Sequence, residues 1–247
     1  MKKSILLLFI TFLFIISFNI TVGASGWGFK KNPNHTPPEI GSYQKEIEGT
    51  NSFYVGSPDE NKVYLTFDAG YDNGNLSGIL DTLKDKKVKA TFFVTGDFVN
   101  RFSDLTKRMV EEGHIVANHS YSHKTINSQS KPDLENDLKK LEDSFQNLTG
   151  TEMVKVFRPP KGEFDRNSLL TLKELGYKTV FWSIAFQDWS DEHQRGKEYS
   201  YNSVINNLHP GAIILMHTVS KSNREALPDI IDEITNQGYE FALVTEL

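Results

Sequence analysis

From residue 62 onwards, short apolar runs alternate with amphipathic stretches, and this alternation constrains the fold more than any other feature of the sequence. Runs such as "KVYLTF", "KATFFV" and "AIILMH" have the length and the β-branched and aromatic content of buried strands. Stretches such as "GNLSGILDTLKDKK" and "REALPDIIDEITNQG" carry apolar residues at helical spacing. The pattern predicts an α/β protein whose parallel strands are joined by helical crossovers. Because about seven strands fall in one domain, we expect a distorted (β/α) barrel rather than a doubly wound sheet.

The first 24 residues differ from the rest of the chain. Lys2 and Lys3 precede the apolar run "SILLLFITFLFIISF", and "TVGA" ends with small residues. This pattern predicts a secretory signal peptide that is cleaved after Ala24. The alternative is an uncleaved N-terminal membrane anchor, because the apolar run approaches spanning length. Either reading places the protein outside the cytoplasmic membrane, in the cell wall region.

Residues 25–60 are rich in Gly, Pro, Asn and Ser, and we interpret them as an extended leader. Aromatic residues such as Trp27 and Phe53 are expected to pack this leader on the domain formed by residues 61–247. The chain has no cysteine, so a hydrophobic core must stabilise it. Its formal charge of −5, which becomes −7 when two N-terminal lysines are cleaved off, argues against a nucleic-acid partner. We expect a monomer.

Ionisable or metal-ligating side chains follow five of the predicted strands. In parallel α/β domains the carboxyl ends of the strands meet at one edge, where active sites form. Five such residue positions, far apart in the sequence, are therefore expected to converge on one site. In chain order these side chains are Asp68, the pair His119 and His123, Arg158, Asp188 and His217.

The same residues lie in five short motifs that resemble those of the polysaccharide deacetylase family, the carbohydrate esterases with a NodB homology domain. The motifs are "TFDAG", "HSYSH", "RPPKG", "DW" and "LMH", and the resemblance spans residues 62–247. The longer stretches "TFDAGYDNG" and "HPGAIILMHTVS" are most similar to N-acetylmuramic acid deacetylases of spore-forming bacteria, which prepare cortex peptidoglycan for muramic δ-lactam. The resemblance implies a barrel of the NodB type and the hydrolysis of an N-acetyl group.

Amide hydrolysis needs an activated water, a stabilised oxyanion and a proton for the departing amine. A divalent metal supports the first two, and zinc is expected here, with cobalt or another divalent ion as alternatives. His119 and His123, four residues apart, can converge on one ion if the chain turns helically between them. The resemblance implies that Asp68 is the general base and that Arg158 keeps it ionised.

The remaining motif residues complete the expected site. His217 is expected to be the general acid, oriented by Asp188. Lys161 is expected to contribute its backbone N–H to the oxyanion and its side chain to an acidic group of the substrate. Trp189 and Leu215 are expected to wall the site.

One position departs from the family pattern. The family usually has a second aspartate after the first, as the third metal ligand, and this chain has Ala69 there. A methyl group cannot bind a metal, so water, Asp72 or Asn73 would have to complete the coordination. Loss of an anionic ligand is expected to weaken metal binding.

These observations predict an exported, metal-dependent N-deacetylase that acts on peptidoglycan glycan strands, with N-acetylmuramic acid as the expected sugar. A second enzyme hypothesis is deacetylation of N-acetylglucosamine, of a chitin-type glycan or of xylan. A third hypothesis, from another class, is a glycan-binding pseudoenzyme whose metal site is degraded at Ala69.

Overall fold

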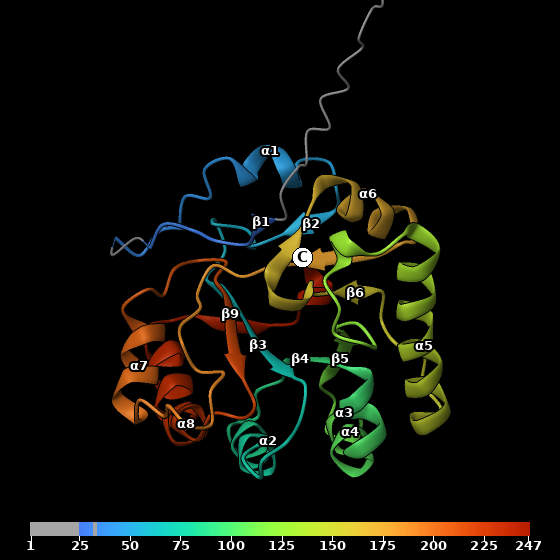
Figure 1. The fold of residues 1–247 in the computed structure, drawn as a ribbon. Helices are drawn as coiled ribbons and strands as arrows, with labels where there is room; N and C mark the ends of the chain where they lie inside the picture. The colour runs from blue at the N-terminus through green and yellow to red at the C-terminus, as the bar shows by residue number, and fades with distance from the viewer. Residues whose placement is uncertain (1–24, 32–33) are drawn as a thin grey trace, which may run out of the picture.

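The computed structural model describes residues 25–31 and 34–247, so the predicted signal peptide lies outside the described residues. Within the described part of the chain, no helix has both the length and the apolar character needed to span a bilayer. Figure 1 shows a central sheet with most of the helices around it and the leader across one end.

The strands form a distorted parallel barrel, as the alternating pattern predicts. Residues 61–247 contribute seven strands to one sheet, and every pairing between them is parallel. Strands β3, β4, β5, β6 and β8 follow one another in space, and β9 and β10 both pair with β3. After β8, Ile184 forms a parallel bridge with Ile214 of β9, which brings the two sides of the barrel together. The strand bounds are β3 Lys62–Ala69, β4 Thr91–Val94, β5 Ile115–Asn118, β6 Val156–Phe157, β8 Lys178–Val180, β9 Ile213–His217 and β10 Glu240–Ala242.

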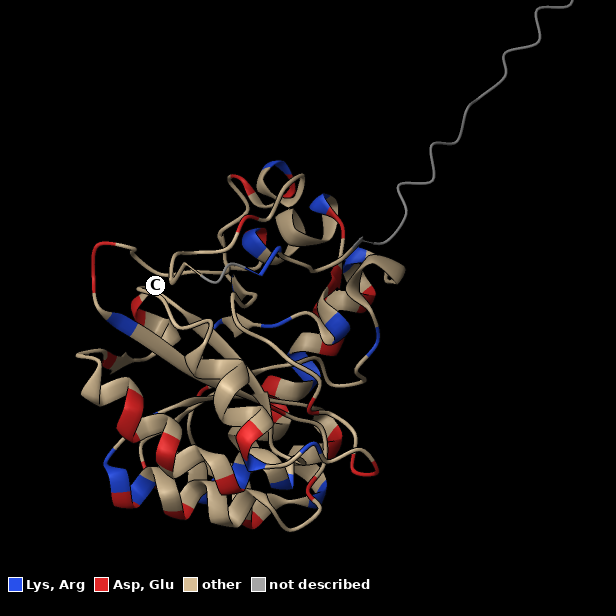
Figure 2. Ribbon diagram, turned by 90° about the vertical axis from the view of Figure 1, so that its left-hand side faces the viewer, with Lys and Arg blue, Asp and Glu red and all other residues tan. Residues whose placement is uncertain are grey.

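Helices cover the outside of the sheet (Figure 1). Their bounds are α2 Leu76–Lys86, α3 Gly96–Arg101, α4 Ser103–Glu111, α5 Lys131–Thr149, α6 Arg166–Glu174, α7 Lys197–Ile205 and α8 Lys221–Asn236. The sequence predicts one helix over residues 98–113, but the chain breaks at Phe102, whose φ of −120° and ψ of 47° are not helical. In Figure 2, acidic and basic residues are interspersed along the helices of the ribbon.

The alternation of side chains along β3 separates two hydrophobic layers. Val63, Leu65 and Phe67 pack with residues of α2 and α8, between the sheet and the helices. Tyr64 packs on the opposite face, with residues of the other strands in the barrel interior. Because successive side chains of a strand point to opposite faces, Asp68 shares the inner face with Tyr64. Asp68 therefore lies at the carboxyl end of the barrel interior.

The leader is packed on the barrel and is more ordered than expected. It contains two short strands, β1 Ser25–Gly26 and β2 Ser52–Phe53, and a five-residue helix, α1 Tyr43–Ile47, which the sequence does not predict. Strand β2 pairs with β8, and β1 pairs with β7 Glu163–Phe164. The Trp27 ring stacks on Phe181 with a centroid distance of 4.3 Å. Backbone pairing and the packing of aromatic side chains together fix the leader to the domain.

Candidate active site

The five predicted strand ends meet at one cavity of about 840 Å³. It opens at the carboxyl ends of β3, β5 and β9 and is bounded by the segments that follow β6 and β8. The predicted site residues that line it are Asp68, His119, His123, Lys161, Trp189, Leu215 and His217. Arg158 and Asp188 are buried directly behind it and bond to Asp68 and His217. The structure thus brings these nine residues together around one cavity.

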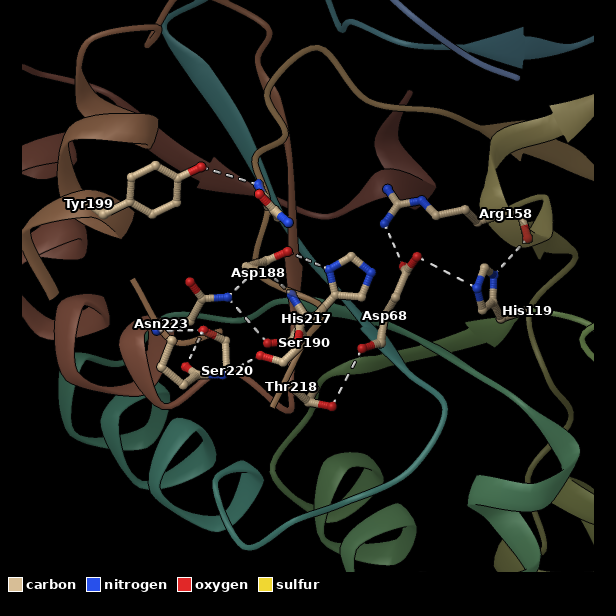
Figure 3. A network of polar contacts seen from close by, with 12 residues as sticks. Asp68, His119, Arg158, Asp188, Ser190, Tyr199, His217, Thr218, Ser220 and Asn223 are labelled. Atoms are coloured by element: carbon tan, nitrogen blue, oxygen red, sulfur yellow. Dashed lines mark hydrogen bonds and ion pairs between the residues drawn. The ribbon is translucent and has the colours of Figure 1, made fainter. Parts of the chain in front are cut away.

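Asp68 forms an ion pair with a fully buried arginine (Figure 3). The Arg158 Nη1–H donates to Asp68 Oδ1 at 2.8 Å, and the guanidinium is held further by the carbonyls of Val180 and Phe181. The second carboxylate oxygen, Oδ2, lies 3.6 Å from His119 Nε2. Burial favours the neutral acid, but Arg158, through its charge and its hydrogen bond, and the nearby His119 and His217 together outweigh burial and hold the pKa of Asp68 below its usual value. Asp68 is therefore an ionised carboxylate with one oxygen occupied and one turned to the histidines.

The two histidines are arranged as a pair of neutral metal ligands would be. Their ring centroids are 5.1 Å apart. The Nδ1 of His119 lies 2.8 Å from the Arg158 carbonyl oxygen, and because a carbonyl can only accept, Nδ1 carries the proton and Nε2 keeps a free lone pair. Burial lowers the pKa of His119 to about 4, although Asp68 opposes this shift. The two imidazole side chains are therefore suited to bind a divalent cation through their nitrogen atoms, with Asp68 nearby.

A third protein ligand is not placed beside this pair. Among the residues that the structure describes, no group of three His, Cys, Asp or Glu side chains is arranged to hold a metal ion. Asp72 accepts the N–H of Leu76 at 3.2 Å, at the start of α2, and it does not belong to the described cavity lining. Ala69 is fully buried in the layer between the sheet and the helices. Asn73 donates its amide to Asp191 and to the carbonyl of Val219.

The loop that carries the histidines is held from below by Asp137 of α5, which the sequence analysis missed. Its carboxylate accepts from the Ser120 hydroxyl at 2.7 Å, from the Tyr121 N–H at 2.8 Å and from the Ser122 N–H at 3.1 Å. The loop needs such support because Ser120 and His123 both have positive φ, at 70° and 55°. A signal was present in the sequence. Asp137 falls on the apolar stripe of its helix, beside Leu134 and Leu138, where a charge is unexpected.

His217 is held on the other side of Asp68 by a buried carboxylate (Figure 3). Its Nδ1–H donates to Asp188 Oδ1 at 2.6 Å, and its backbone N–H donates to Oδ2 at 2.8 Å. The amide of Asn223 also donates to Asp188 Oδ2, at 2.6 Å. Burial disfavours the charged imidazole, but the Asp188 carboxylate and its hydrogen bond prevail and raise the pKa of His217. Asn223 was not predicted as a site residue. It lies three residues after Ser220, which is the N-cap of α8, so in the sequence it looks like an ordinary residue of the first helical turn.

Lys161 occupies a tight turn at the cavity rim. Its φ is 58°, which is uncommon for a residue other than glycine. The next residue, Gly162, also has positive φ, and a Cβ there would lie 2.8 Å from the Trp182 ring and 2.9 Å from Trp27. The backbone of Gly162 therefore packs directly against the two tryptophans. This contact fixes the turn, and the turn places Lys161 at the cavity.

Comparison with known proteins agrees with this arrangement. Residues 55–180 match the polysaccharide deacetylase family. The peptidoglycan-N-acetylmuramic acid deacetylase PdaA of Bacillus subtilis is 44% identical over 222 residues, which cover 90% of this chain and 84% of PdaA. The chain belongs to the polysaccharide deacetylase family.

Two solved structures of family 4 carbohydrate esterases resemble this fold. The structure of Bacillus subtilis PdaA, a family 4 carbohydrate esterase, superposes with a TM-score of 0.88 at 43% identity, covering 91% of this chain and 96% of PdaA. A CE4 family pseudoenzyme from Bacillus anthracis superposes with a TM-score of 0.73 at 31% identity, covering 79% of this chain and 68% of that one. The expectation of a NodB-type barrel is confirmed.

Proposed function

We propose that this protein is a metal-dependent hydrolase that removes N-acetyl groups from peptidoglycan, with the N-acetylmuramic acid residues as its substrate. The observation that carries the proposal is the convergence, around one cavity, of an ionised carboxylate, two histidines whose pKa is lowered and a third histidine whose pKa is raised. Amide hydrolysis needs these groups together, as base, metal ligands and acid. A binding module has no use for a buried Asp68–Arg158 pair and a buried Asp188–His217 pair side by side.

His119 and His123 are the residues that would hold the divalent cation. When bound, such an ion supplies a Lewis acid that polarises the acyl oxygen and lowers the pKa of nearby water. Zinc is the expected ion because its preferred ligands include neutral imidazole, and cobalt is a plausible replacement. The free Nε2 of His119, fixed by the hydrogen bond of Nδ1 to the Arg158 carbonyl, is the nitrogen in position to bind it.

Asp68 acts as the general base in this proposal. Oδ1 is occupied by Arg158, so Oδ2 accepts the proton of the attacking water as the water oxygen bonds to the acetyl carbon. Arg158 keeps the carboxylate ionised and stops it from rotating. The backbone N–H of Lys161 is assigned to the developing oxyanion.

His217 acts as the general acid. Its Nδ1–H is bound to Asp188, so Nε2 delivers the proton to the amide nitrogen as the carbon–nitrogen bond breaks. Acetate and a sugar with a free amine are the products. The raised pKa of His217 keeps this proton available near neutral pH.

The choice of sugar rests on the similarity to PdaA and on Lys161. N-acetylmuramic acid carries a lactyl carboxylate when no peptide caps it, and an ammonium group at the cavity rim would attract that anion. We assign the reaction to the cell wall, outside the cytoplasmic membrane, and to the route toward muramic δ-lactam in spore cortex.

The rival is a glycan-binding pseudoenzyme. It is favoured by the absence of a carboxylate at Ala69 and by the similarity to the Bacillus anthracis pseudoenzyme. This rival predicts binding of glycan without release of acetate at any metal concentration.

The test measures acetate release from purified peptidoglycan glycan strands across a zinc and a cobalt series, for the wild type and for Asp68→Asn. The wild type is expected to release acetate. Asp68→Asn is expected to lose turnover while retaining the metal during dialysis, and His119→Ala is expected to lose both. A wild type that releases no acetate in either series would contradict the proposal, and equal metal loss in the Asp68 and His119 variants would make Asp68 a ligand.

A further inference from the structure

Two large hydrophobic side chains are exposed among the described residues, and both line the catalytic cavity. Tyr71 is 40% exposed and Trp189 is 57% exposed. Tyr71 lies in the segment between β3 and α2, and Trp189 lies in the segment between β8 and α7. Exposed aromatic rings confined to a cavity rim mark a surface that a ligand covers.

A single carboxylate links these two segments. The Tyr71 O–H donates to Asp191 Oδ2 at 2.6 Å, and the Asn73 amide donates to Asp191 Oδ1 at 2.6 Å. The Asn73 amide also donates to the Val219 carbonyl at 2.8 Å, directly after β9. Asp191 thus ties its own segment to the segment between β3 and α2, and Asn73 extends the link to the segment that follows β9.

The backbone of Trp189 is fixed on both sides although its ring is exposed. On one side, Asp188 accepts three hydrogen bonds, two from His217 and one from Asn223. On the other side, two residues further along the chain, Asp191 accepts two hydrogen bonds, one from Tyr71 and one from Asn73. The Trp189 ring lies with its centroid 6.1 Å from that of His217. Because the neighbours of Trp189 in the chain are held on both sides, little backbone entropy is lost when a ligand covers the ring.

We propose that Asp191 is a positioning residue that holds Tyr71 and Trp189 as a paired contact for a second sugar ring of the glycan strand. This ring is a neighbour of the sugar whose acetamide enters the cavity. The inference rests on the proposed function and deepens it, because it predicts that the enzyme reads a chain of sugars rather than one.

A pyranose ring is the occupant that fits these two side chains. Its apolar C–H face packs on an aromatic ring, while its hydroxyl groups need polar partners at the edge. The rim supplies such partners in the Tyr71 hydroxyl and in Asp97, which also lines the cavity. The hydrogen bond to Asp191, and to a lesser extent burial, raises the pKa of Tyr71 to about 12. The O–H therefore stays protonated and bound to Asp191, and the hydroxyl oxygen can accept a hydrogen bond from a sugar hydroxyl.

The first experiment measures binding without turnover. Peptide-free glycan strands are titrated into the Asp68→Asn variant while tryptophan fluorescence is recorded. The chain has three tryptophans, of which Trp27 is buried and Trp182 half-buried. We expect a fluorescence change that disappears in the Asp68→Asn, Trp189→Phe double variant. A change that persists without Trp189 would overturn the proposal, as would saturable binding without any change.

The second experiment compares KM for N-acetylmuramic acid alone with KM for a disaccharide from peptidoglycan, which adds one neighbouring sugar ring. The wild type is expected to have an about tenfold lower KM for the disaccharide, the effect of one aromatic contact. Asp191→Ala is expected to abolish this length preference, and Asp191→Asn, which keeps one acceptor oxygen, to retain part of it. The matched control is Asp232→Asn, which removes an exposed carboxylate paired with Lys86 outside the cavity.

The outcomes separate the two proposals. An active enzyme whose length preference is the same in Asp191→Ala and in the wild type would refute the role of Asp191 and leave deacetylation intact. An enzyme that binds strands through Trp189 but releases no acetate would refute deacetylation and leave the sugar contact intact.

Discussion

Replacement of Asp137 by alanine tests whether the histidine loop depends on its buried anchor. In the Asp137→Ala variant, the Ser120 hydroxyl and the Tyr121 N–H lose a charged acceptor, whereas the exposed Ser122 can bond to water. A hydrogen bond to a charged group contributes about 1.5–3 kcal/mol, so loss of two is expected to lower the free energy of unfolding by about 3–6 kcal/mol. In a domain of this size that corresponds to a fall in Tm of about 6–24 °C.

The assay for this variant combines thermal unfolding with metal retention. Metal affinity is expected to fall as well, because His123 has a strained backbone that the anchored loop maintains. Asp137→Asn is the matched control. Its amide keeps one acceptor oxygen, so its Tm should fall by about half as much as that of Asp137→Ala. Unchanged Tm and unchanged metal retention in Asp137→Ala would refute the view that Asp137 builds the site.

Three further predictions concern the chemistry. His217→Ala is expected to slow amide hydrolysis far more than hydrolysis of an activated acetate ester, because an amine must be protonated to leave and an activated phenolate need not be; equal losses would remove the acid role. Asp188→Asn is expected to move the alkaline limb of the pH–rate profile to lower pH, because Asp188 raises the pKa of His217 and the charged form is then lost earlier; an unmoved limb would assign it to another group. Lys161→Met is expected to raise KM several-fold for peptide-free glycan strands and less for a neutral chitin oligomer; an equal response would make the lysine structural.

The barrel and most of the site could be predicted because both depend on local patterns. Strand and helix periodicity gave the order of elements, and parallel strands bring their carboxyl ends together whatever the intervening sequence. Asp68, Arg158 and His217 could therefore be grouped without knowledge of distances.

The residues that were missed act through contacts that no local pattern shows. Asp137 bonds to residues of the histidine loop that lie 15–17 positions earlier in the chain, and Asn223 bonds to Asp188, which lies 35 positions earlier. The break at Phe102 and the helix α1 in the leader likewise follow from no periodic pattern in the sequence.

Ala69 lies elsewhere in the structure than its place in the motif suggests. Motif comparison places it next to the metal ligands. In the structure it belongs to the hydrophobic layer between the sheet and the helices, whereas Asp68 faces the cavity. A metal at this site would have His119 and His123 as its protein ligands, with Asp68 as the nearest carboxylate to His119.

The most direct test of the account is mass spectrometry of glycan strands from peptidoglycan after incubation with the zinc-loaded wild-type enzyme. Strands with and without stem peptides are compared, and fragmentation locates each free amine. The account predicts free amines on muramic acid residues, more of them in strands without peptides, and none after incubation with Asp68→Asn. Free amines confined to glucosamine residues would contradict the assignment of the substrate, and strands that keep every acetyl group would contradict the central claim that this protein is a deacetylase.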